Sequence, residues 1–466
     1  MQKSVGDHMR MSTNKDIVNI VLFLGIIALF SSISLFATNM AFMVTDKVYN
    51  GVMVGDIAVG GLSVKEAEEK IEASFRRRLN DPPIILNFEG NHWKIGTDEI
   101  KWKLDTEKLA QQAYNVGRRG NLLQQFQERF LTINGGYKVP LAPLYNKEQL
   151  SEIIASIADE IDREPHDAKI LLDGLRIIQL PDTSGRKVAI DQLTITLHEK
   201  LNVGFPVIVD IPVTEVKPKI QTIDIEEIDS IISMYTTQFN LANENRVLNI
   251  ALASNSISGT LLRPGEVFSF NDLVGLRIAE FGYREAPVFI EGKIVPDFGG
   301  GVCQVSSTLY NAVLLADMKI LERSSHFRPP GYVPLGQDAT VADNLLDFKF
   351  SNVLPHNIYI LSQVSKDSLT VYILSRNNPS RPEVIVESVK EKVIEPNTII
   401  KQDPRLDYGK QIIENMGQKG FVVSTYRVKR LSGKEVEREH LFTDKFKPDD
   451  RVVRVGTKVS PRQAIK

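Results

Sequence analysis

A single uninterrupted apolar segment near the N-terminus constrains this chain more than any other feature. Residues 17–36 contain no charged side chain and only one amide, Asn19. A helix of this length rises about 30 Å, which matches the hydrocarbon core of a bilayer. We therefore predict one transmembrane helix over residues 17–38, with nearly all of the remaining chain beyond it.

Two other structures compete with this anchor, namely a buried core helix and a cleaved signal peptide. Core helices rarely need so long an apolar run, and the apolar part of a signal peptide usually has about 7–15 residues. Whether processing removes the helix stays open. Lys3, Arg10 and Lys15 precede the segment, so we expect a cytoplasmic stub of residues 1–16. The predicted location is the cell membrane, single-pass, with an extracytoplasmic bulk from about Thr45.

The composition predicts several ordinary globular domains and excludes some classes of site. The chain has 466 residues, 42% hydrophobic and 24% charged, which is enough for about three domains. A net charge of −2 gives no broad basic surface for nucleic acid. Cys303 is the only cysteine, so no intrachain disulfide forms. The seven histidines do not follow metal-ligand spacings, and we predict no metal and no cofactor.

Residues 47–225, the N-terminal region, alternate strand-like and helix-like segments. Ser63 and Glu66 form a capping-box pattern at the start of one predicted helix. The order of elements repeats loosely, which predicts two α+β units at about 47–138 and 139–225.

Three motifs in this region resemble the peptidoglycan-binding domain of YoaR-like bacterial envelope proteins. They are VGGLSVKEAEEKI at 59–71, GRRGN at 117–121 and IDREPHDA at 161–168. The resemblance implies a region that faces the cell wall and binds peptidoglycan.

The segment with the strongest pattern for a reactive site is DFGGGVCQVSSTLYNAVLLAD, residues 297–317. Three glycines precede Cys303 and allow a tight turn, and a helix is expected from about Gln304. The positive end of a helix dipole lowers the pKa of a thiol placed there, and free amide groups at that end stabilise an oxyanion. The segment therefore predicts a nucleophilic thiol, and the competing interpretation is a cysteine that serves only packing.

A nucleophilic thiol needs a base, and His326 and Asp338 follow Cys303 in the chain. We predict a triad of Cys303, His326 and Asp338, in which the carboxylate orients the imidazole. Asp343 and Asp347 compete with Asp338 for the third role. The order Cys, His, Asp is also that of transglutaminase-like enzymes.

Residues 226–375, the central domain, closely resemble the VanW family. The matching motifs are RPGEVFSFND at 263–272, FGGGVCQVSSTLYNAVL at 298–314 and YVPLGQDATV at 332–341. The resemblance implies an α+β domain of the cell envelope and gives a context rather than a reaction. The residues predicted to bind a ligand, with capping or packing as the alternative for the polar ones on the helix, are Gly300, Gly301, Gln304, Ser306, Ser307, Asn311, Arg263 and Tyr332.

The last part of the chain differs in composition from the rest. Residues 376–382 read as a linker because of their Asn, Pro and Ser content. Residues 383–458, the C-terminal module, combine β-branched runs with spaced glycines, which predicts a small β-rich unit. The motifs DYGK at 407–410, TYRV at 425–428 and RVGT at 454–457 resemble the G-five domain, which implies contact with wall glycans.

Together these patterns predict an α+β multidomain protein of the envelope of a Gram-positive bacterium. The first hypothesis is a membrane-anchored protein that binds peptidoglycan or wall glycan. The alternative is a Cys-dependent amide hydrolase or acyl transferase, such as a transpeptidase, that acts on wall peptides through the central domain. A third is an assembly scaffold whose partners are other envelope proteins. A thiol that reacts and responds to His326 separates the enzyme from the other two.

Overall fold

The computed structural model describes residues 17–31, 33–34, 45–78, 84–203, 206–290 and 293–458. Residues 17–31 are helical. Among the described residues, no helix combines the length and the apolar character that crossing a membrane requires. The predicted cytoplasmic stub of residues 1–16, together with residues 32 and 35–38 of the predicted anchor, lies outside the described residues.

The chain is a mixed α+β multidomain protein that divides into two compact units. The first unit comprises residues up to 164 and residues 184–216, and the second comprises residues 165–183 and 217–466. The elements of the first unit after the N-terminal helix are β1 (Val52–Val54), β2 (Ile57–Ala58), α2 (Val64–Arg78), β3 (Ile84–Phe88), β4 (Asn91–Ile95), α3 (Thr106–Asn115), α4 (Leu122–Asn134), β5 (Tyr137–Val139), α5 (Lys147–Ile161), β8 (Gly185–Val188), α6 (Ile190–Leu201), β9 (Val207–Asp210) and β10 (Val213–Val216).

Local sequence signals set several of these elements. The capping box before α2 is confirmed, because the amide of Ser63 donates to Glu66 (2.8 Å) and the amide of Glu66 donates to the Ser63 hydroxyl (3.3 Å). Strand β3 pairs in parallel with β9 and antiparallel with β4. This sheet therefore crosses the boundary predicted at residue 138, because β3 precedes that position and β9 follows it.

The elements of the second unit begin with a hairpin contributed by the N-terminal region. They are β6 (Lys169–Asp173), β7 (Arg176–Leu180), α7 (Thr222–Ile225), β11 (Ser230–Gln238), α8 (Glu244–Ile257), β12 (Thr260–Leu262), β13 (Val267–Ser269), α9 (Phe270–Val274), η1 (Ala279–Phe281), β14 (Glu285–Ile290), β15 (Lys293–Phe298), α10 (Val302–Leu315), β16 (Lys319–Glu322), β17 (Lys349–Ser351), β18 (Ile358–Ser365) and β19 (Ser368–Ser375).

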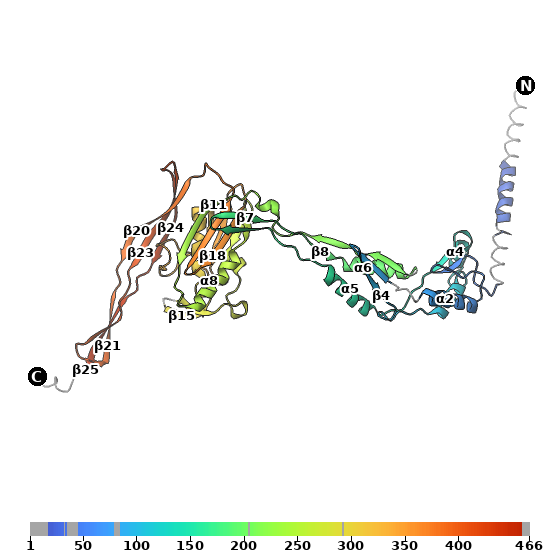
Figure 1. Ribbon diagram of the computed structural model, residues 1–466, viewed down its shortest axis with the longest axis horizontal. Helices are drawn as coiled ribbons and strands as arrows, with labels where there is room; N and C mark the ends of the chain where they lie inside the picture. The colour runs from blue at the N-terminus through green and yellow to red at the C-terminus, as the bar shows by residue number, and fades with distance from the viewer. Residues whose placement is uncertain are drawn as a thin grey trace, which may run out of the picture. The chain divides into compact units, whose positions relative to one another are not determined.

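The core of the central domain lies between helices and a sheet of order β11-β19-β18-β12. Helix α10 is buried along almost its whole length, and α8 lies against the sheet near β18 (Figure 1). A helix that is buried on all sides is the expected result of a segment with few charges. In a second sheet, β13-β17-β16, the rings of Phe268 and Phe350 stack at 4.8 Å. Phe348, just before β17, packs edge-on against Tyr310 of α10 at 5.5 Å.

The C-terminal module consists of long strands in two three-stranded sheets, so its predicted β-rich character is confirmed. The first sheet has the order β20 (Glu383–Ile394), β23 (Gly420–Leu431), β24 (Lys434–Phe446). The second has the order β21 (Thr398–Asp407), β25 (Arg451–Lys458), β22 (Gln411–Asn415). Figure 1 draws these strands in orange and red.

Phe350→Ala should destabilise the second unit by about 3–5 kcal/mol, because it removes a fully buried ring and leaves a cavity. Trp93 and Trp102, the only tryptophans, both lie in the first unit. In urea titrations we therefore expect the part of the far-UV circular dichroism change that comes from the second unit to move to lower urea, while the tryptophan fluorescence transition stays in place. An equal shift of both transitions would show that the two units do not unfold separately.

Candidate functional site

A glycine turn between β15 and α10 determines where Cys303 lies. Gly299 and Gly301 have φ angles of 78° and 110°, in the left-handed region that other residues avoid. A Cβ added at Gly300 would come within 2.8 Å of Ala286 on β14. The three glycines are thus required by backbone geometry and close packing. The helix starts at Val302, slightly earlier than predicted, and places Cys303 in its first turn. The amides of Val302 and Gln304, on either side of Cys303, donate to the carbonyls of Gly299 and Gly301 at 3.0 Å.

The structure brings the three predicted triad residues together. His326 Nδ1 lies 2.6 Å from Asp338 Oδ2, and the His326 backbone amide donates to the same oxygen at 2.6 Å. The Cys303 thiol donates to the Val341 carbonyl at 3.4 Å, and His326 lies close enough to the thiol to lower its pKa. Cys303 is half-buried, whereas Asp338 is fully buried. This is the arrangement of nucleophile, base and orienting carboxylate.

The two competing carboxylates are engaged elsewhere. Asp343 pairs with Arg277, through both its guanidinium and its backbone amide. Asp347 accepts hydrogen bonds from the Ser269 hydroxyl at 2.6 Å and from the Asn271 amide at 2.9 Å, and so joins β13 to the start of α9. Of the three candidates, Asp338 is the one that contacts His326.

The electrostatics of the cluster favour a thiolate beside an imidazolium. Burial opposes ionisation of Cys303, but the hydrogen bond and charge of His326 lower the pKa of the thiol below its usual value. Burial alone would lower the pKa of His326, yet its bonds to Asp338 and Cys303 raise that pKa to about 9. Burial raises the pKa of Asp338. The hydrogen bonds and charges of His326 and Arg323 outweigh this effect and hold the pKa of the carboxyl below its usual range.

Arg323 completes the cluster and was missed by the sequence reasoning. Its side chain and that of Asp338 are each 1% exposed and lie 3.0 Å apart. The other side of the guanidinium contacts both carboxylate oxygens of Asp444 at 2.7 Å. Asp444 belongs to β24 of the C-terminal module, more than a hundred residues further along the chain. No local sequence signal links these groups.

The first sheet of the C-terminal module also supports the loop before Asp338. The Thr425 hydroxyl donates to the Gly336 carbonyl at 3.1 Å, and Gln337 donates to the Ser388 hydroxyl at 3.0 Å. A side chain at Gly336 would collide with Thr425. Strands of the C-terminal module therefore hold the segment that carries the third triad residue.

Most of the predicted ligand-binding polar residues on α10 instead hold this loop from the other side. Ser306 donates to the Ala339 carbonyl at 2.6 Å, and Ser307 accepts from the Ala339 amide at 3.0 Å. Asn311 donates to the Gln337 carbonyl at 2.7 Å. All three side chains are buried. Their contacts are those of packing groups, which is the alternative that the sequence left open.

The remaining predicted ligand-binding residues divide into two places. Tyr332 lies over the triad, with its ring centroid 6.5 Å from that of His326. Burial, together with the negative charge of Cys303, raises the pKa of Tyr332, so its hydroxyl stays protonated and can donate. Gln304 is buried beside Cys303 and donates to the Gln238 carbonyl at 2.9 Å.

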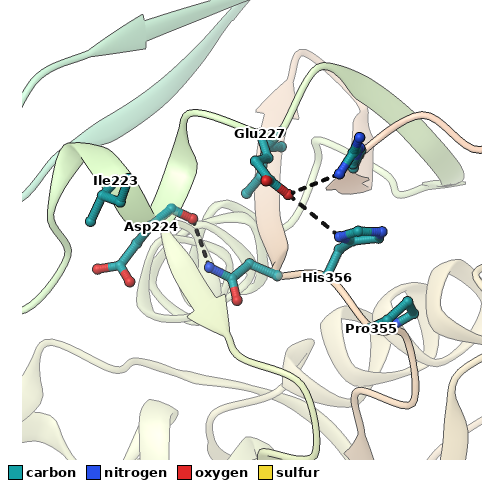
Figure 2. A pocket seen from close by; sticks show the side chains of 8 residues that line it. Ile223, Asp224, Glu227, Pro355 and His356 are labelled. Carbon is teal, nitrogen blue, oxygen red and sulfur yellow. Dashed lines mark hydrogen bonds and ion pairs between the residues drawn. The ribbon is translucent and has the colours of Figure 1, made fainter.

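Arg263 has no contact with the triad and bonds instead to Asp224, one of the residues that line a separate hollow. Its guanidinium pairs with Asp224 at 3.0 Å. Figure 2 shows this small hollow, of about 120 Å³, where Glu227 reaches toward the ring of His356 at 3.4 Å. Its charged groups pair with one another, so the hollow offers no unpaired charge to a ligand. Within the described ranges, no cluster of three His, Cys, Asp or Glu side chains is arranged to hold a metal.

Comparison with known proteins agrees with the three regions. The family model "VanW like protein" matches residues 245–374, "Putative peptidoglycan binding domain" matches 93–208, and "G5 domain" matches 385–458. YoaR of Bacillus subtilis (strain 168), described as uncharacterized, is 33% identical over 238 residues, which are 51% of this chain and 78% of that protein. The chain belongs to the YoaR family of VanW-like proteins.

Other similar proteins match shorter parts of this YoaR-family chain. The vancomycin B-type resistance protein VanW of Enterococcus faecalis (strain ATCC 700802 / V583) is 33% identical over 132 residues, which are 27% of this chain and about half (48%) of that protein. Among solved structures, an IgA1 protease G5 domain is 26% identical and the G5 region of HP0197 is 23% identical. They cover 18% and 16% of this chain and 99% of each of those chains, with TM-scores of 0.14 and 0.12.

The pKa of Cys303 can be measured directly, because no other thiol exists in the chain. We expect the pH profile of iodoacetamide alkylation to give a pKa below the usual value of about 8.5, since the His326 imidazolium stabilises the thiolate. Alkylation should slow as the pH falls through this lowered pKa. His326→Ala should move the profile to higher pH. The matched control is His356→Ala, which removes a histidine that pairs with Glu227; an unchanged profile in His326→Ala would leave Cys303 a packing residue.

Asp444→Asn tests whether the C-terminal module positions the triad. Removing the charge leaves Arg323 with one carboxylate, so we expect a loss of about 1–3 kcal/mol in unfolding free energy and a shift of the Cys303 alkylation profile to higher pH. Asp403→Asn is the control, because Asp403 is also buried but pairs with Arg454 in the other sheet at 3.0 Å. A destabilised Asp444→Asn protein whose thiol profile matches that of Asp403→Asn would contradict the positioning role.

Proposed function

We propose that this chain is a cell-wall protein that uses Cys303 to break and re-form amide bonds in wall peptides. The observation that carries the proposal is His326, which is held by the buried carboxylate of Asp338 at 2.6 Å and which lowers the pKa of the half-buried Cys303 thiol. A packing cysteine requires none of these partners. The family matches to peptidoglycan-binding and G5 domains support a location at the cell wall.

The reaction follows from the ionisation of the pair. The Cys303 thiolate attacks the carbonyl carbon of an amide, and a C–S bond forms as the carbonyl oxygen takes the negative charge. The positive end of the α10 dipole, where Cys303 lies, stabilises that oxyanion. The C–N bond then breaks while the His326 imidazolium gives its proton to the leaving amine. The product is a thioester on Cys303 and a free amine.

The thioester has two outcomes that differ only in the second nucleophile. His326, now neutral, takes a proton from water or from an incoming amine as that group attacks the thioester carbon. Attack by water gives hydrolysis, and attack by an amine gives a new amide and therefore a cross-link. In both cases the Cys303 thiolate leaves and the imidazolium is restored, so the protons balance over one cycle.

The other parts of the chain supply the location in this proposal. The N-terminal region and the C-terminal module bind peptidoglycan or wall glycan, which raises the local concentration of substrate around the central domain.

The segment 17–38 anchors the chain in the membrane. The motivation for an anchor is the apolar composition of residues 17–31 and their exposure, with Phe23 and Phe30 more than 60% exposed. Protease protection of residues 1–16 in intact cells would test the anchor, and accessibility of these residues from outside would contradict it.

Activity is measured by incubating the full chain with stem peptides from peptidoglycan, with and without an amine acceptor, and following cleavage and transfer by mass spectrometry. Wild type should form product, and Cys303→Ser should lose at least about a hundredfold in rate, since the nucleophile is replaced by an unactivated hydroxyl. Activity should fall above about pH 9, where His326 loses its proton.

The same variant provides the control for binding. Cys303→Ser should sediment with insoluble peptidoglycan as wild type does, because the binding regions are unchanged. Binding without turnover in wild type, together with an ordinary thiol pKa, would show a wall-binding protein with a structural cysteine.

A further inference from the structure

An open cleft of about 430 Å³ lies next to the triad in the central domain. Tyr332, which interacts with both His326 and Cys303, forms one wall. Gln304, the neighbour of Cys303 on α10, forms another. The residues that complete the lining come from the end of β11, the start of α8 and the loop before Tyr332: Gln238, Phe239, Asn240, Ala242, Asn243, Arg246 and Gly331. A substrate that reaches Cys303 from this side passes over these residues.

Arg246 is the positively charged side chain of this lining. Its stem packs against Gly301, at the turn before Cys303. Its guanidinium donates to the Gln304 side-chain oxygen at 2.8 Å. Gln304 is neutral, and among the described residues no carboxylate forms an ion pair with Arg246. Most arginines in this domain do have such a partner, as Arg263, Arg277 and Arg323 show.

A half-buried guanidinium with only a neutral partner is incompletely compensated. Removing a guanidinium from water costs free energy unless an anion accepts hydrogen bonds from its N–H groups. A carboxylate can accept two of these hydrogen bonds at once. Burial lowers the pKa of Arg246, while the negative charge of the Cys303 thiolate acts in the opposite direction. The guanidinium therefore stays charged and faces the space beside the thiol.

We propose that Arg246 binds a carboxylate of the substrate, so that the enzyme acts on peptides that carry a free carboxylate close to the reacting amide. This inference rests on the proposed function of Cys303 and adds the class of substrate. A carboxylate held by Arg246 fixes the position of the neighbouring carbonyl over Cys303, which is the benefit of orientation in catalysis.

Arg246 could instead serve only to stabilise the thiolate. The two roles differ in what they do to a neutral reagent. A thiolate-stabilising arginine affects every reagent through the thiol pKa, whereas a carboxylate-binding arginine affects only reagents that carry a carboxylate.

Iodoacetate and iodoacetamide separate these roles, because both transfer a two-carbon group to Cys303 with loss of iodide and only iodoacetate carries a carboxylate. The measured quantity is the ratio of the iodoacetate rate to the iodoacetamide rate in the full-length chain, divided by the same ratio in the urea-unfolded chain. We expect this normalised ratio to exceed one in wild type and to fall about tenfold in Arg246→Gln, as for the loss of a hydrogen bond between charged groups. Gln keeps the Cγ atom that contacts Gly301.

Two further variants make the result interpretable. Arg246→Lys should keep part of the preference, because the charge remains without the planar fork. Arg376→Gln removes an exposed arginine that pairs with Glu227 and should leave the ratio unchanged. Circular dichroism and thermal unfolding of each variant establish that the fold is retained.

The outcomes also separate this inference from the proposed function. A normalised ratio that is the same in wild type and Arg246→Gln overturns the carboxylate site. Equal slowing of both reagents in Arg246→Gln, with a raised thiol pKa, also overturns it and assigns Arg246 to thiolate stabilisation. An ordinary thiol pKa in the iodoacetamide arm of wild type contradicts the function of Cys303 itself.

Discussion

The ion pair between Arg323 and Asp338 is the interaction on which the candidate site depends. Both side chains are almost completely buried, and removing two charges from water costs several kcal/mol per ion unless hydrogen bonds satisfy them. Here each remaining group has a partner, because Asp338 accepts from His326 twice and Arg323 bonds to Asp444. The cost of burial is thus offset by a network that permits one geometry, and that geometry fixes the orientation of the imidazole.

A second constraint acts on the nucleophile from the backbone. The glycine turn before α10 lets the helix start against β14 and α8 without a Cβ collision, while serine and asparagine side chains of the same helix bond the loop that carries Asp338. Helix α10 and the loop that carries Asp338 are therefore joined by buried hydrogen bonds. Moving Cys303 away from His326 would break these hydrogen bonds.

Short-range sequence patterns predicted part of the candidate site and part of the fold. The glycines before Cys303, the helix after it and the order Cys, His, Asp led to the three residues that meet in space, and β-branched runs with glycines led to a β-rich module. The sequence did not show which carboxylate would reach His326, because Asp343 and Asp347 look equivalent until their partners Arg277 and Ser269 are known. It could not show Arg323 with Asp444 or the pairing of β3 with β9, since these contacts join distant segments. The sequence left ligand binding and packing open for the polar residues on α10, because their burial depends on tertiary packing.

The ion pair between Asp444 and Arg323 matters for any experiment that divides this chain into fragments. The stretch that matches VanW-like proteins ends at residue 374, whereas the carboxylate that completes its ionic network lies seventy positions later in a stretch of another family. A fragment that ends at the family boundary keeps Cys303, His326 and Asp338 but leaves the buried Arg323 without Asp444. In this chain the VanW-like stretch and the G5 stretch are therefore joined by a buried ion pair as well as by the linker between them.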